Sequence, residues 1–446
     1  MFWNAIFALL MSLASKLPDP RPRQTFVRTA IGLICGDRPK TITSALSFWG
    51  EEQSDWSATY RLFSQTQWLP DDMFDVIALN ALSFCGGSGP IYAGQDDTLA
   101  RKTGRRIPGV AYARDPLSPP FQTNLVLGQR FLQTSIMIKP GQEPGPFRAI
   151  PAGFLHAPPV KAGRRATEEE RAAVKEARKK QNVSSAALRE LVRLRRVLDG
   201  DANSRQRWLL AAVDNSFANK TYLRGLPRMT AAVARIRKNA KLRAPLPPEL
   251  RKGNRKYGAD LPTPEQYLHD ETIPWLIYSV FVAGQVRELK YKVIDPVCWP
   301  GVTLDKQLRL IVIKPAGYRL RAGSKLLYRE PAYLICTELS ISVEDYIQAY
   351  VARWEVEVSF RDEKTGLGLG QAQVWCEESV QRAPSLLVIG YACMLLASAA
   401  AFGDKRTDAF DPLPLWRNRE QNRPSVRDLT RLLRKEALEN RRDLAA

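Results

Sequence analysis

The chain has 446 residues, of which 45% are apolar and 25% charged, and this balance excludes a largely disordered protein. One ordinary hydrophobic core does not contain so long a chain, so we expect two or three domains. Lysine and arginine number 66 against 46 acidic residues, and the net charge of +20 favours a polyanionic partner, nucleic acid above all.

Two apolar runs have the composition of targeting or membrane segments. The first, at residues 1–14, is not preceded by a basic residue, which a secretory signal requires, so we expect no signal there. The second, at residues 386–402, is near the lower length limit of a membrane span. It is rich in alanine, glycine and serine, so we interpret it as a buried packing helix and expect no membrane partner.

The N-terminal region has the pattern of short helices. Residues 41–50 (TITSALSFWG) predict one helix, and residues 54–65 (SDWSATYRLFSQ) predict another with Ser54 or Asp55 as its N-cap. A helix-turn-helix and an ordinary helical hairpin share this outline, and both interpretations stay open. In a helix-turn-helix the candidate DNA contacts are Ser57, Tyr60 and Arg61.

Strands follow the helical region. Residues 91–98 (IYAGQDDT) predict a short strand that ends at Asp96 and Asp97. Residues 121–140 are apolar and β-branched, and Gly128 divides them into two predicted strands.

A loop, a helix and a buried strand are predicted next. Residues from about 140 to 165 are rich in proline, glycine and basic side chains and predict a loop. Residues 166–198 are rich in alanine, glutamate, lysine and arginine and predict a long helix. The apolar run in 207–217 (RWLLAAVDNSF) predicts a strand that is buried on both faces and ends at Asp214.

The second half of the chain begins with a basic stretch, residues 228–270, that has few long apolar runs. Residues 273–338 predict several strands, and helix resumes at about residue 342. Residues 403–446 form a charged tail with one predicted helix. This order of elements indicates an α/β core that is interrupted by a second β region.

The helix that begins near residue 342 places one carboxylate in a distinctive position. Four polar residues lie within about 60° of arc on one face: Tyr350, Arg353, Glu357 and Lys364. An apolar strip lies beside them: Ile347, Val351, Trp354 and Val358. The other acids of this stretch are expected to face solvent: Glu355, Asp362 and Glu363. A salt-bridged surface helix would show the same pattern, so the helix alone does not decide between structure and chemistry.

Two strand-end aspartates favour the chemical interpretation. In an open α/β sheet the carboxyl ends of the strands gather the active site. Two such aspartates and a helical glutamate can hold two Mg²⁺ ions, because hard cations prefer oxygen ligands. A metal pair of this kind activates a nucleophile and stabilises the leaving oxygen in phosphoryl transfer. A lone strand-end aspartate is weaker support, because many only cap the following turn.

The motifs resemble those of the DDE transposases of bacterial insertion sequences, in the branch marked by a Y-x2-R-x3-E-x6-K helix. All four positions of that signature match: Tyr350, Arg353, Glu357 and Lys364. QDDT at 95–98 resembles the first acidic block, and AAVDNSF at 211–217 resembles the second. ARIRKNAKL at 234–242 resembles the basic stretch that commonly follows.

The resemblance implies a ribonuclease-H-like catalytic core with a β-rich insertion, plus an N-terminal helical domain. The implied boundaries are a helical DNA-binding domain at 1–88, the first part of the core at 89–225, a basic, β-rich insertion at 226–340, a helical completion of the core at 341–402 and a charged tail at 403–446.

The resemblance also implies a metal site. By carry-over, Asp96, Asp214 and Glu357 are the catalytic residues and bind Mg²⁺ or Mn²⁺. The first position is ambiguous, because the D-x-T spacing to Thr98 favours Asp96, whereas direct adjacency to that threonine favours Asp97.

DNA contacts follow from the same carry-over. The implied phosphate contacts near the cleaved end are Tyr350, Arg353 and Lys364. Trp354 holds the place of a tryptophan that can stack on a displaced base, although its helical angle also suits core packing.

Basic clusters add further candidate DNA contacts. One follows the first acidic block: Arg101, Lys102, Arg105 and Arg106. A denser patch lies in the second half: Lys238, Lys241, Arg251, Lys252, Arg255 and Lys256. A third group, on the long helix, is expected to be only a solvated face: Arg178, Lys179 and Lys180.

The expected function is transposition. The protein would bind terminal inverted repeats of double-stranded DNA, hydrolyse the DNA ends and join the 3′-OH to target DNA, as a cytoplasmic, nucleoid-associated homodimer on DNA. Two alternatives stay open: a nuclease of the same fold that cuts without joining, and a non-catalytic DNA-binding relic. Intact acids at Asp96, Asp214 and Glu357 argue against the relic.

Overall fold

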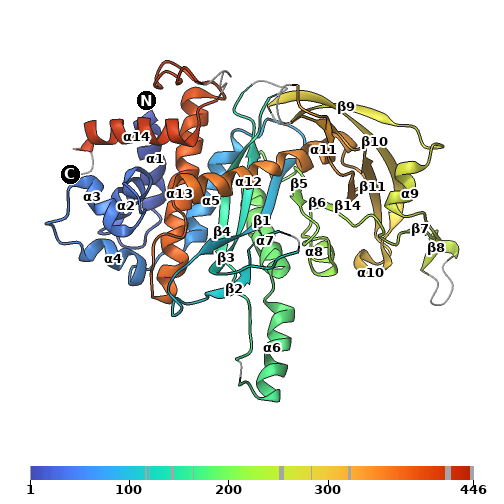
Figure 1. The fold of residues 1–446 in the computed structure, drawn as a ribbon, viewed down its shortest axis with the longest axis horizontal. Helices are drawn as coiled ribbons and strands as arrows, with labels where there is room; N and C mark the ends of the chain where they lie inside the picture. The colour runs from blue at the N-terminus through green and yellow to red at the C-terminus, as the bar shows by residue number, and fades with distance from the viewer. Residues whose placement is uncertain are drawn as a thin grey trace.

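The computed structural model describes residues 2–115, 118–119, 121–141, 145–163, 165–250, 256–282, 284–319, 323–416 and 423–441 (Figure 1). The helices are α1 (Phe2–Ala14), α2 (Arg23–Cys35), α3 (Ile42–Trp49), α4 (Ser57–Ser64), α5 (Pro70–Leu82), α6 (Glu168–Lys180), α7 (Val183–Gly200), α8 (Lys220–Arg224), η1 (Pro248–Leu250), α9 (Pro264–His269), α10 (Pro300–Thr303), α11 (Val343–Ala352), α12 (Trp354–Arg361), the π turn η2 (Asp362–Gly366), α13 (Glu377–Phe402) and α14 (Val426–Glu439). The strands are β1 (Ile91–Arg101), β2 (Ala111–Arg114), β3 (Leu125–Ile138), β4 (Arg148–His156), β5 (Leu209–Val213), β6 (Thr230–Arg235), β7 (Arg243–Pro245), β8 (Tyr257–Asp260), β9 (Leu276–Val282), β10 (Gln285–Cys298), β11 (Gln307–Ile313), β12 (Gly317–Tyr318), β13 (Leu327–Tyr328) and β14 (Ala332–Cys336).

One mixed sheet of 12 strands runs through the protein in the order β2-β3-β1-β5-β6-β14-β11-β10-β7-β8, with β4 paired to β3 and β9 to β10 (Figure 1). β1, β5 and β6 pair in parallel, whereas the other neighbouring strands pair antiparallel. α7 lies on one face of β1, and α11 and α12 cover the other. The fold is therefore mixed α/β, and the strands of the second half continue the central sheet.

β5 agrees with the sequence prediction, and β1 does not. All five residues of β5 are buried, and the strand ends directly before Asp214. β1 continues to Arg101, so Asp96 and Asp97 lie inside the strand instead of at its end. The reason is that β3 goes on pairing with β1 after β5 has stopped, because the parallel pairing ends at Gly94.

Three further strand predictions are corrected. Gly128 does not divide β3, because it lies within the β1–β3 pairing opposite Arg101. The predicted loop of 140–165 contains the buried strand β4, whose Pro151 lies at a register shift beside β3. The basic stretch contains β6, a strand of which half the residues are alanine and which is buried between β5 and β14.

The long charged helix is two helices, because Asn182 caps a new helix by accepting a bond from the Ser185 N–H at 2.9 Å. α6 projects from the body of the protein (Figure 1), and none of its described residues is buried. A capping box at Thr167, acids in its first turn and bases in its last turn stabilise it locally.

α13 is the packing helix predicted from 386–402. It is long and apolar enough to cross a membrane, but 83% of its apolar stretch is buried inside the protein. It lies between the N-terminal helices and the sheet (Figure 1), in contact with α1, α2, α5 and β4. α1, at the apolar start of the chain, packs against it through Phe2 and its neighbours. The predicted tail helix is present as α14.

The N-terminal helices differ from a helix-turn-helix. Residues 50–56 connect α3 to α4, whereas the turn of that motif has only about three or four residues. α3 and α4 both pack on α2. Trp56 is the N-cap of α4, and the carboxylate of Asp55 accepts a bond from the Ser57 N–H at 2.8 Å. Tyr60 and Arg61 are exposed on α4.

Candidate active site

Asp96 lies on the face of β1 that α12 covers. A Cβ added to Gly94, two residues earlier on the same face, would lie 2.8 Å from Val356 and 3.7 Å from Arg353. Glycine therefore lets α12 approach the strand closely. On the other face, Gln95 donates to a carbonyl of α7 at 2.9 Å. The alternation of the strand thus directs Asp96 toward α12.

Arg353 joins two of the predicted catalytic acids. Its Nη1 donates to Asp96 Oδ2 at 2.9 Å, and its Nη2 donates to Glu357 Oε1 at 3.2 Å. Only 13% of the Arg353 side chain is exposed, against 18% for Asp96 and 36% for Glu357. The helix and the strand therefore bring Asp96 and Glu357 to opposite arms of one guanidinium.

Asp214 directly follows the neighbouring strand β5, at the level of Asp96. The last parallel pair is Gly94 with Ala212, so Asp96 and Asp214 each follow it by two residues. Asp214 Oδ1 accepts bonds from the N–H and the hydroxyl of Ser216 at 2.8 and 2.6 Å. This carboxylate therefore caps its own turn, and it also acts electrostatically on Asp96.

Asp97 has a different partner. Its Oδ2 lies 3.2 Å from Nε of Arg130 on β3. Both side chains lie on the face of the β1–β3 pair opposite to that of Asp96. Burial raises the pKa of Asp97, and Arg130 opposes that shift. Of the two candidates for the first acid, Asp96 is the one that shares Arg353 with Glu357.

The helix itself departs from a regular spiral. It is interrupted at Arg353, and η2 is a π turn in which the Leu367 N–H donates to Asp362 O at 2.9 Å. The prediction that Glu363 faces solvent is wrong, because its side chain is fully buried on the same helix face as Val356 and Phe360. Trp354 is 56% exposed, so the prediction of core packing for it is also wrong.

The two remaining acids of the stretch are also partly shielded. Glu355 accepts a bond from Arg423 at 2.9 Å, and Asp362 pairs with Arg361 at 3.2 Å. Their side chains are only 21% and 20% exposed. They do not lie on a freely solvated face as predicted.

The charges at the site favour a cation. Burial raises the pKa of Asp96 to about 7, Arg353 opposes that shift, and the negative charge of Asp214 adds to it. The three acids offer only oxygen donors, which suits Mg²⁺ or Mn²⁺. Among the residues that the structure describes, no group of three or more acidic, histidine or cysteine side chains lies close enough to hold a metal ion. The donors fit a divalent ion in their chemistry, and Arg353 is bonded to two of them, Asp96 and Glu357.

Asp96→Asn should change how stability depends on pH in metal-free buffer. Its raised pKa keeps the proton on folded Asp96 up to about pH 7, whereas the ordinary pKa of an aspartate is 3.8. As pH rises through this window the unfolded chain releases its proton first, so wild type loses stability relative to the variant. We expect a relative loss on the order of 1–3 kcal/mol between pH 4.5 and pH 8, measured by urea unfolding. The exposed Asp408→Asn serves as control, and parallel curves for wild type and Asp96→Asn would contradict the burial argument.

The other implied phosphate contacts lie on the same helical segment. Lys364 is partly buried, its ammonium lies 5.8 Å from the Phe360 ring centre, and burial lowers its pKa. Asp97 and Arg101 both act on this ammonium electrostatically. Tyr350 packs partly buried against the core below α11.

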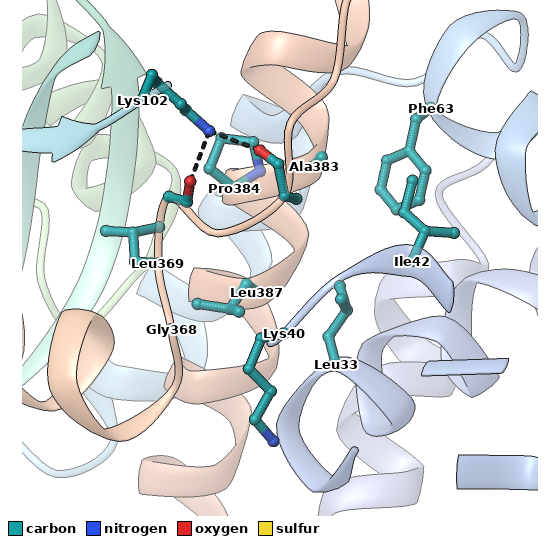
Figure 2. A pocket seen from close by; sticks show the side chains of 12 residues that line it. Leu33, Lys40, Ile42, Phe63, Lys102, Gly368, Leu369, Ala383, Pro384 and Leu387 are labelled. Atoms are coloured by element: carbon teal, nitrogen blue, oxygen red, sulfur yellow. Dashed lines mark hydrogen bonds between the residues drawn. The ribbon is translucent and has the colours of Figure 1, made fainter. Parts of the chain in front are cut away.

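The basic cluster after β1 divides into exposed and buried members. Lys102 is buried, and its Nζ donates to the carbonyls of Gly370 and Ala372 at 3.0 and 2.6 Å (Figure 2). Burial lowers its pKa to about 8. A DNA-path role does not fit this position, because Lys102 ties β1 to the segment after η2. Arg101 is exposed and pairs with Asp115 at 2.8 Å, and Arg105 and Arg106 are exposed.

The second basic patch is only partly described. Lys238 is exposed and pairs with Glu265 at 2.8 Å, and Lys241 and Lys256 are exposed. Arg251, Lys252 and Arg255 lie outside the described residues. The third group behaves as predicted, because Arg178, Lys179 and Lys180 are exposed on α6.

Two features of the site were missed in the sequence. Gly94 carries a recognisable signal, since an isolated glycine inside a strand pattern indicates close approach of another element. Glu363 carries none. It lies beside Gln133 on β3, whose amide, in its better orientation, donates to the carboxylate at 2.9 Å, and Gln133 is itself paired with Asp96. Burial raises the pKa of Glu363 well above its ordinary value.

Comparison with known families agrees with this geometry. Residues 17–275 match the family described as DDE superfamily endonuclease, and this range covers more than half of the chain. The match includes Asp96 and Asp214 and ends before Glu357. No curated protein matches the chain. The central mixed sheet is consistent with a ribonuclease-H-like DDE fold. The chain belongs to the DDE superfamily endonuclease family.

Proposed function

We propose that the protein is a DNA transposase. It binds the terminal inverted repeats of its element, cleaves the DNA ends by two-metal hydrolysis and joins the freed 3′-OH to target DNA. The family supports a nuclease- or transposase-type activity. The observation that carries the proposal is the guanidinium that Asp96 and Glu357 share. Arg353 bonds Glu357, four residues later on α12, and also Asp96 on β1, which lies 257 residues earlier in the chain.

In this proposal Asp96, Asp214 and Glu357 hold the ions. Two bound Mg²⁺ ions supply an activated water and stabilise the leaving oxygen of the phosphodiester. Asp96 lies in β1, Asp214 directly follows the paired strand β5, and Glu357 lies on α12, so regular elements place all three acids.

DNA is oriented by the same helical segment. Lys364 serves as a point charge for a phosphate. Tyr350 lies about one helical turn before Arg353 on the same segment. Trp354 is exposed beside Arg353 and can stack on an unpaired base. The exposed arginines after β1 and the lysines near β7 extend the basic surface. A homodimer on DNA brings one such site to each end of the element.

Binding to the ends and joining of the ends test the proposal together. Duplexes with the inverted repeats that flank the gene should bind far more tightly than scrambled duplexes in a gel-shift assay. With Mg²⁺ and a supercoiled target, the same duplexes should yield strand-joined products on a sequencing gel. A nuclease without joining activity would leave only cut ends, and a non-catalytic relic would leave bound, uncut DNA. Either result would replace the transposase proposal.

A further inference from the structure

We infer that the guanidinium of Arg353 acts as a built-in counter-ion for the carboxylates of the proposed metal site. Its guanidinium holds Asp96 and Glu357 together while no divalent ion is bound, and it has to leave this place when one enters. The inference rests on the proposed metal-dependent function and concerns the same three acids.

The bridge has the geometry of an internal counter-ion. The two arms of the guanidinium reach acids from two different elements, at 2.9 Å on β1 and 3.2 Å on α12. The planar fork of arginine suits two carboxylates at once, which a lysine ammonium would serve only as a point charge. Arg353 also lies where α11 ends and α12 begins, and its N–H donates to Ala349 O at 3.1 Å. The break in the helix thus sets the side chain between the acids.

The bridge is incomplete, so it can be displaced. The Nε of Arg353 is buried without a hydrogen-bond partner, although its other nitrogens are bonded. A buried donor without a partner costs free energy. The conformation in which Arg353 bonds both acids is therefore less stable than it would be with every nitrogen bonded. A guanidinium turned outward would satisfy that donor with water or with a phosphate of DNA.

A divalent ion and the guanidinium compete for the same oxygens. Both need Asp96 and Glu357, and two cations a few ångströms apart in a partly buried site repel strongly. Arg353 and the ion are therefore alternatives at this position. Because coupling between binding sites is reciprocal, DNA that draws Arg353 to a phosphate should also raise the affinity for the ion.

The test measures Mn²⁺ binding through the electron paramagnetic resonance signal of the free ion, without turnover. Arg353→Gln should bind Mn²⁺ at least about tenfold more tightly than wild type, since neighbouring groups couple on this scale. The matched control is Arg361→Gln, an exposed arginine on the same helix, which should bind as wild type does. Equal or weaker binding by Arg353→Gln would overturn the inference.

Two further variants keep the test decisive. If Arg353→Gln fails to fold, Arg353→Lys should show a smaller gain in Mn²⁺ affinity, and no gain would count against the bridge. In an Arg353→Gly protein, added methylguanidinium should weaken Mn²⁺ binding again, while wild type should not respond.

The proposed function and the inference fail in different ways. Asp96→Asn and Glu357→Gln should each weaken Mn²⁺ binding. If both bind as wild type does, the acids are not the metal site and the proposed function is wrong. If both of these variants bind Mn²⁺ more weakly while Arg353→Gln does not bind it more tightly, only the counter-ion role of Arg353 is wrong.

Discussion

Glu357→Gln should reduce metal-dependent cleavage of DNA ends by at least about 10³-fold while leaving the fold intact. The amide keeps the volume of the side chain but removes the charge, so one of three proposed metal ligands is lost. The side chain is 36% exposed and bonded to Arg353 alone among the described residues. Its loss therefore removes chemistry and little packing. The measurement is the rate of end cleavage under single-turnover conditions with Mg²⁺.

Glu355→Gln is the matched control, two residues earlier on the same helix. Glu355 accepts a bond from Arg423 at 2.9 Å and takes no part in the proposed metal site. The variant should cleave at close to the wild-type rate, with thermal melting used to check both folds. Equal losses in the two variants would show that the helix as a whole matters and that Glu357 has no special role.

Arg195→Leu should destabilise the protein by about 3–5 kcal/mol, the cost of breaking a buried polar network. Arg195 is 3% exposed and donates to the carboxylate of Asp199 at 2.9 Å. Its Nη atoms also donate to four backbone carbonyls: Ser204, Arg205, Arg207 and Met229. Leucine would remove these donors, and Ser204 O and Met229 O would keep only the bonds from the Arg207 and Leu209 N–H groups.

The expected effect of Arg195→Leu is on the sheet that supports the site. Arg207 lies just before β5, which ends directly before Asp214. Met229 lies just before the adjacent strand β6. Arg196→Leu, at the exposed next position of α7, should change stability by no more than about 0.5 kcal/mol. Urea unfolding followed by circular dichroism measures both. A similar change in the two variants would mean that the carbonyl network contributes no more than a surface residue.

Much of the site could be predicted because its motifs are local. The apolar run before Asp214 predicted a buried strand, and the helical spacing placed Arg353 and Glu357 on one face, where they do share a hydrogen bond. An isolated glycine such as Gly94 inside a strand pattern also indicates the close approach of another element, here α12 to β1. These features depend on short stretches of sequence and simple periodicity.

The remainder depends on tertiary contacts. β4 contains Pro151 and Gly153, which read as a loop, yet the proline lies at a register shift and the glycine lies against Glu190 of α7. β6 has only two branched residues, Thr230 and Val233, and its alanines lie in a strand paired between β5 and β14 and in contact with α11. Glu363 is buried on the same helix face as Val356 and Phe360, although a carboxylate is not the residue type expected there.

An anomalous difference map from crystals grown with Mn²⁺ and a cleaved inverted-repeat end tests the central claim most directly. We predict manganese density shared by the carboxylates of Asp96, Asp214 and Glu357, with Arg353 turned away from the acids. Glu357 without a cation, and Arg353 still bridging it to Asp96 while manganese lies elsewhere or is absent, would contradict the account.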